Sequence, residues 1–221
     1  MDAMMRTAIG LGLALVLAGC AADRPPPVEE RASAYCPTPP VVPVTAQGLV
    51  LPPPVLRGNA VDWESVYAYG LEHSLASPRT LAGKGPQTAR DLARLDMVGN
   101  SFDRNLRFQT LAAEGTLMVR TGVWSMRQWL GVPPDVPDAQ LVGALLATEC
   151  ALWEGNRGAA RAALAKVAGA PDALERIAPA DGSSPPPVPV EVAAAASIAA
   201  KAIRSHGVAD GPYIRLGRAG F

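Results

Sequence analysis

Proline clusters limit where helices can form in this chain of 221 residues. Most of its 22 prolines fall in three stretches, at residues 24–56, 133–137 and 178–190. Proline lacks the amide hydrogen and fixes φ, so it stops helices and favours extended chain. The clusters predict a proline-rich tether over residues 20–60, a break between helices near Pro133, and a second linker over residues 178–190.

Between the proline clusters, large apolar residues recur at spacings of three and four, the period of a helix with one apolar face. The segment 87–130 is either one long helix or two with a break near Gly115, because glycine costs about 1 kcal/mol against alanine in a helix interior. The other predicted helices cover residues 62–75 and 138–153, a short stretch ending near Val167, and the alanine-rich stretch 191–205. The predicted fold is all-α, a small helical bundle or a set of helical hairpins over residues 61–177. Residues 191–221 are expected to form a helix that packs back weakly or binds elsewhere, followed by a flexible tail.

The segment 87–130 also supplies most of the candidate core. These positions are Leu92, Leu95, Val98, Phe102, Leu106, Leu111, Met118, Val123, Trp124 and Trp129, and Leu145 joins them from the next helix. Alanine is not counted, because its abundance here is weak evidence of burial. In the tether, Gly48-Leu49-Val50-Leu51 is apolar enough to dock on the body as an edge strand or a strap.

The first twenty residues carry an export signal. Arg6 supplies a positive charge, Ala8–Leu17 an apolar stretch, and Ala18-Gly19 small residues before a cleavage site. The apolar stretch is shorter than the roughly 20 residues that a permanent transmembrane helix needs. The run Leu17-Ala18-Gly19-Cys20 resembles the lipobox of bacterial lipoproteins, and the alternative is a plain signal peptide with a coincidental cysteine.

The lipoprotein resemblance implies that residues 1–19 are removed and that Cys20 carries acyl chains. Two or three acyl chains hold a protein durably on a bilayer, whereas one chain binds only marginally. In that family an aspartate directly after the cysteine retains many members in the inner membrane. This chain has Ala21 there, so the resemblance implies the periplasmic face of the outer membrane.

The remaining cysteines, Cys36 and Cys150, are candidates for a disulfide, because an exported chain meets an oxidising compartment. The alternative is that Cys150 is a small buried apolar residue. Two such cysteines and two histidines without close spacing predict no metal site, and no cofactor is expected.

Residues 139–171 resemble a tetratricopeptide repeat in their turn and second helix, through Gly155-Asn156, Ala160, Leu164 and Pro171. The first helix lacks the aromatic and glycine positions of that family. No second copy follows at a 34-residue period, whereas solenoids need about three repeats. A generic helical hairpin is the alternative that we favour.

The charges indicate no nucleic-acid partner, because 20 basic and 20 acidic residues balance without forming a block. No catalytic motif is present: His73 and His206 stand alone, and no spacing selects a pair from Glu64, Glu72, Asp96 and Glu114. We therefore expect a non-catalytic interaction or scaffold module that binds an envelope protein. The alternative is a small envelope enzyme acting on peptidoglycan, which a deep cleft with two facing carboxylates would favour. The expected interaction surface comprises Trp124, Trp129 and Trp153.

Overall fold

The computed structural model describes residues 41–53, 62–108 and 113–205. This part of the protein is all-α, as the sequence predicts. Its helices are α3 (Trp63–His73), α4 (Gly85–Arg104), α5 (Ala113–Leu130), α6 (Asp138–Trp153), α7 (Arg157–Leu164), α8 (Ala173–Ile177) and α9 (Val190–Ser205), with short 3-10 helices at Pro78–Leu81 and Leu106–Phe108.

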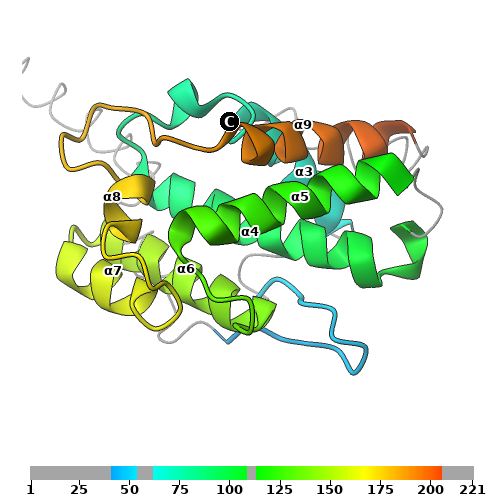
Figure 1. Ribbon diagram of the computed structural model, residues 1–221, viewed down its shortest axis with the longest axis horizontal. Helices are drawn as coiled ribbons and strands as arrows, with labels where there is room; N and C mark the ends of the chain where they lie inside the picture. The colour runs from blue at the N-terminus through cyan, green and yellow to red at the C-terminus, as the bar shows by residue number, and fades with distance from the viewer. Residues whose placement is uncertain (1–40, 54–61, 109–112, 206–221) are drawn as a thin grey trace, which may run out of the picture.

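Helix α4 is the centre of the bundle and packs against α3, α5 and α6 (Figure 1). Helix α9 lies along α5 and also contacts α3, while α7 folds back on α6. Gly155 makes the turn between α6 and α7 with a positive φ of 70°, and Asn156 caps α7 by accepting a bond from the Ala159 amide at 2.9 Å. The α6–α7 pair is therefore a helical hairpin, as predicted.

The segment 87–130 forms two helices, but the predicted break near Gly115 is wrong. α4 ends at Arg104, where Asn105 leaves the helix with a ψ of 118°. The Asn105 side chain donates to Glu64 Oε1 at 3.1 Å, which ties this helix end to α3. Gly115 lies in the first turn of α5, where its effect on helix stability is smaller than in the interior.

The core contains most of the predicted residues. Leu92, Leu95, Val98, Phe102 and Leu145 are buried, and the Phe102 ring stacks on Phe108 with centroids 4.9 Å apart. Leu106, Met118 and Trp124 are exposed, so their assignment to the core is wrong, whereas Leu111 lies outside the described residues. The reason is the chain break, which gives α5 its own helical phase. Its buried positions are Val119, Gly122, Met126 and Leu130.

Helix α9 packs more closely than its alanine content suggested. Six of its side chains are buried, namely Val192, Ala195, Ala196, Ala199, Ala200 and Ile203. A Cβ atom on Gly122 would lie 2.2 Å from the Cβ of Ala195, so only small side chains permit this approach. The alanines therefore build part of the core.

Residues 41–53, which we call the strap, dock on the body. An antiparallel bridge joins Val44 to Val50, and the turn between them uses Gly48 at a φ of 79°. Val50 is buried, and its amide donates to Asn100 Oδ1 on α4 at 2.9 Å. The apolar patch of the predicted tether thus lies against the helical body as a strap.

Candidate interaction site

Helices α4 and α5 run antiparallel. On each helix, residues that are three or four positions apart in the sequence form the face that meets the other helix. Together with the start of α6 they line a pocket of about 150 Å³. The lining residues are Asp96, Gly99, Asn100 and Asp103 from α4, Arg120, Val123, Trp124 and Arg127 from α5, and Asp138 from α6. The helices approach closely at Gly99, where a Cβ atom would lie 2.5 Å from Val123 Cγ2.

Two ion pairs cross between these helices. In the inner pair, Arg127 Nε donates to Asp96 Oδ1 at 3.2 Å, and both side chains are largely buried. In the outer pair, Arg120 Nε lies 3.4 Å from Asp103 Oδ1, and both side chains are well exposed. The other nitrogens of Arg127 donate to Asp138 Oδ1 at 2.5 Å and to the Val136 carbonyl at 2.9 Å.

Asp96 is the most perturbed acid of the pocket. Its side chain is 1% exposed, and its Oδ2 atom has no hydrogen-bond partner within the described ranges. Burial raises the pKa of Asp96 to about 7; Arg127 opposes this shift and the charge of Asp138 adds to it. Asp96 therefore changes charge near neutral pH.

Asn100 connects the pocket to the strap. Its Oδ1 accepts from the Val50 amide, while its Nδ2 donates to Asp138 Oδ2 at 2.7 Å and to the Gly48 carbonyl at 3.4 Å. Arg104, one turn further along α4, donates to the Gln47 carbonyl at 3.3 Å. The same polar network thus holds the pocket and the strap.

Of the three predicted tryptophans, one lines the pocket. Trp124 lines the pocket and is 59% exposed as a whole residue, whereas Trp129 is partly buried against the core. Trp153 is exposed at the end of α6. Asp138, at the other end of α6, lines the pocket. At 1.5 Å per residue, Trp153 lies about 22 Å along the helix from Asp138, so it is not part of the pocket.

The sequence patterns did not single out Arg120, Arg127 and Asp138 as site residues, and they did not select Asp96 from the other acids. A signal for them exists. Asp96 and Asp103 are seven residues apart on one predicted helical segment, and Arg120 and Arg127 repeat that spacing further along it. Residues seven apart lie on one face of a helix, so an antiparallel pair of helices can match both acids with both arginines.

Other buried acids lie in helix interfaces away from this pocket. Glu149 pairs with Arg90, and Asp91 pairs with Arg94 at 3.2 Å. Burial raises the pKa of both carboxyls, and the arginines oppose the shift. Glu64 accepts from Ser101 Oγ at 3.0 Å and from Asn105. These contacts join α3, α4 and α6.

The candidate histidines give no catalytic arrangement in the described residues. His73 is exposed, and its Nδ1 lies 2.8 Å from the carbonyl oxygen of Tyr69 on its own helix. His206 lies outside the described residues. Within the part that the structure describes, no group of three His, Cys, Asp or Glu residues could hold a metal ion.

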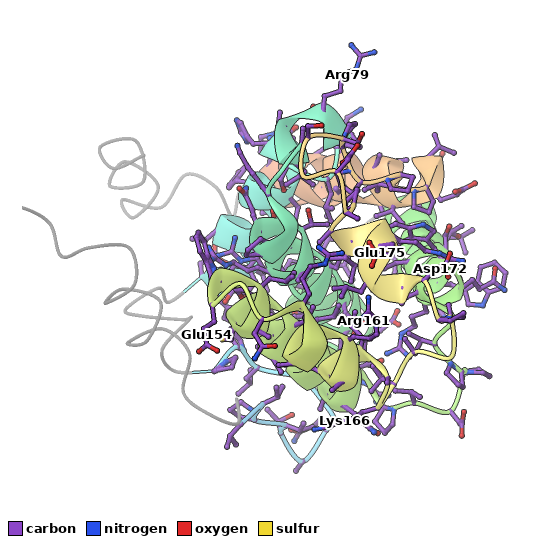
Figure 2. The ribbon with its side chains drawn as sticks, turned by 90° about the vertical axis from the view of Figure 1, so that its left-hand side faces the viewer. Arg79, Glu154, Arg161, Lys166, Asp172 and Glu175 are labelled. Carbon is purple, nitrogen blue, oxygen red and sulfur yellow. The ribbon has the colours of Figure 1, made fainter. Side chains whose placement is uncertain are left out.

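The surface of α7 and α8 is charged and internally paired. Arg161 of α7 and Glu175 of α8 lie beside each other (Figure 2), with Nη2 and Oε1 3.2 Å apart. Arg157 donates to Glu175 Oε2 at 2.7 Å. Exposed pairs of this kind contribute about 0–1 kcal/mol. We read this surface as a solvated face.

Cys150 is disulfide-bonded. The other two cysteines of the chain, Cys20 and Cys36, lie outside the described residues, so the pairing with Cys36 stays a prediction.

None of the helices in the described ranges is long and apolar enough to span a membrane. No known protein family, curated protein or solved structure matches this chain.

Proposed function

We propose that this protein is a non-catalytic helical interaction module of the bacterial cell envelope. It is held at the periplasmic face of the outer membrane by acyl chains on Cys20. The lipobox resemblance at Leu17-Ala18-Gly19-Cys20 supports the anchor. The observation that carries the interaction role is Trp124, an exposed aromatic side chain beside a small polar pocket.

The face of α5 that carries Trp124 suits a protein partner. Leu117, Arg120 and Trp124 are all well exposed and follow one another at spacings of three and four residues, so they share one side of the helix. Tryptophan and arginine are enriched among the residues that dominate binding energy in protein interfaces. We place the partner on this side of α5.

The size of the pocket separates this proposal from a small-molecule site. Pockets for drug-sized ligands span roughly 300–1,000 Å³, whereas this one has a volume of about 150 Å³. That volume suits one anchoring side chain of a partner. It is small for a sugar unit of peptidoglycan with its peptide.

One observation favours the enzyme alternative. Asp96, with a pKa of about 7, shares the pocket with Asp138, and a carboxyl that titrates near neutral pH can act as a general acid. However, Arg127 binds both carboxylates, and Asp96 is almost completely buried. A substrate would have to displace these contacts, so we rank the enzyme second.

Photocrosslinking in intact cells tests the interaction role. A photoreactive amino acid replaces Trp124 in one strain and, as a matched control, the exposed Lys166 just after α7 in another. We expect a discrete protein adduct from position 124 and none from position 166. The proposal fails if position 124 traps no protein while the purified chain digests cell-wall material and Asp138→Asn abolishes that activity.

The anchor has its own test. Cys20→Ser should abolish metabolic labelling with a fatty acid and release the protein from the membrane fraction, with Cys36→Ser as the matched cysteine control. Normal acyl labelling of the Cys20→Ser chain would refute the anchor. Mass spectrometry of peptides from the unreduced protein would identify the cysteine bonded to Cys150.

A further inference from the structure

We infer that the pocket between α4, α5 and the start of α6 takes a cationic side chain, lysine or arginine, from the bound partner. This inference rests on the proposed function and names the chemistry of its contact.

The charges in the pocket favour a cation. Three carboxylates line it, from Asp96, Asp103 and Asp138, against the two guanidinium groups of Arg120 and Arg127. Arg127 directs its donors to Asp96, Asp138 and a backbone carbonyl, so it is already engaged within the protein. Arg120 is largely exposed and offset by Asp103, which leaves a surplus of negative charge on the α6 side.

A buried acceptor also calls for a donor. Asp96 Oδ2 has no partner in the described part of the chain, although the side chain is nearly fully buried and lines the pocket. Buried polar atoms are almost always hydrogen-bonded, so an unpaired one points to a missing partner. An ammonium or guanidinium group provides several N–H donors and no acceptor.

Trp124 provides the second half of the recognition. Trp124 is 59% exposed as a whole residue and lines the same pocket as the carboxylates. Cations bind favourably over the face of tryptophan, and the aliphatic part of lysine or arginine packs on apolar surface. A metal ion would not use the indole in this way, and the described residues contain no metal-binding group of three ligands.

The inference carries a pH dependence. Asp96 faces Arg127 of α5 and Asp138 of α6, while Asp103 and Arg120 lie further out, and its carboxyl titrates at about pH 7. A cationic ligand favours the ionised carboxylate, so its binding releases a proton. Affinity should therefore rise as the pH increases through about 7.

Titration by NMR tests the pocket without the natural partner. The full chain is labelled with ¹⁵N, and the indole N–H signal of Trp124 is assigned with Trp124→Phe. The probe is Nα-acetyl-lysine N-methylamide, and the controls are the matching norleucine and glutamate derivatives. We expect a saturable shift with the lysine probe alone, and an affinity that is higher at pH 8 than at pH 6 by up to about tenfold, the ratio of the ionised fractions of Asp96 at these two pH values.

Variants of the lining residues test whether the NMR shift of the Trp124 indole signal arises from binding in the pocket. Asp138→Asn and the more exposed Asp103→Asn should each weaken binding of the lysine probe, whereas Asp135→Asn, on the exposed loop before α6, should not. Because Asp103 is exposed, its variant remains informative if Asp138→Asn fails to fold. Equal binding of the norleucine or glutamate probe, or the absence of a saturable shift, would overturn the inference. Crosslinks from position 124 would then still uphold the interaction role.

Discussion

Helix α5 packs against α9 on one side and against α4 on another, and these two contacts differ in the chemistry of their side chains. Against α9 it presents Gly122 to Ala195 and Gly115 to Ala202, so that two smooth helices meet through small side chains. Against α4 it presents Arg127 to Asp96 and Arg120 to Asp103. We call these the apolar side and the polar side of α5, although the polar side also contains the close contact of Gly99 with Val123. Since buried ion pairs are often no more stabilising than apolar residues of the same volume, the polar side needs another explanation, and the proposed binding role would supply one.

The largest expected effect is the loss of Arg127. Arg127→Met should lower the free energy of unfolding by about 3–5 kcal/mol, because it leaves the buried Asp96 without its cation. The double variant Asp96→Leu/Arg127→Met should recover that loss or exceed the wild-type stability. Urea denaturation measures both. If the double variant is as unstable as the single one, the polar side contributes to the free energy of unfolding as the apolar side does.

Acidification should stabilise the protein through Asp96. A carboxyl whose pKa is raised on folding binds more protons in the folded state, so the free energy of unfolding falls as pH rises between the ordinary value near 3.8 and about 7, and then levels off. For Asp96 the penalty above pH 7 is on the order of 4 kcal/mol, at about 1.4 kcal/mol per pKa unit. Burial raises the pKa of Asp91 and Glu149 in the same direction.

Urea denaturation between about pH 5 and pH 8 measures this dependence. Asp96→Asn, which does not titrate, should have a clearly flatter profile than the wild-type chain. If its profile is as steep as that of the wild type, the pH dependence arises outside the polar side of α5.

A glycine pair probes the apolar side. Gly122→Ala should cost about 1–3 kcal/mol, because the new Cβ atom would lie 2.2 Å from Ala195 Cβ and 2.7 Å from the Glu191 carbonyl oxygen. Gly115→Ala is the matched control on the same helix. Its Cβ atom would lie 4.0 Å from Ala202, so it should be neutral or stabilise by up to about 1 kcal/mol. Equal melting temperatures for the two variants would contradict close packing of α5 and α9.

The smallest effect is expected from the outer ion pair. Arg120→Gln should change the free energy of unfolding by less than about 1 kcal/mol, because both partners are exposed. The effect should shrink further in salt, which screens exposed charges. A loss comparable to that of Arg127→Met would show that the two pairs do not differ in the way their burial implies.

The sequence predicted what local patterns encode. Helical period and proline breaks were sufficient for the all-α fold and for the burial of Leu92, Phe102 and Leu145. They placed Trp124 among the core candidates as well as on the expected interaction surface, because they do not reveal that α5 has its own helical phase. The five residues of α8 are too few to show a period, and no helix was predicted there.

The pocket was harder to predict, because its contacts join residues far apart in the chain. Asp96 and Arg127 meet only when α4 and α5 pack in one antiparallel register, and Asp138 joins them from the start of α6. The close packing of α9 depends on Gly122 facing Ala195, which a count of large apolar residues overlooks. The raised pKa of Asp96 then follows from burial, which is a property of the whole fold.

The docking of the strap on the body limits how far the folded part of a membrane-anchored protein can lie from its anchor. If Cys20 is the anchor, the stretch of sequence between the anchor and the described body ends at the strap, at Val41, and not at α3. Even fully stretched, the residues between Cys20 and Val41 reach about 70 Å. If Cys36 is the cysteine bonded to Cys150, however, a pull on the anchor would reach α6 through that disulfide before it reached the strap. Without that disulfide, the load would pass through the strap to Asn100, directly beside the pocket.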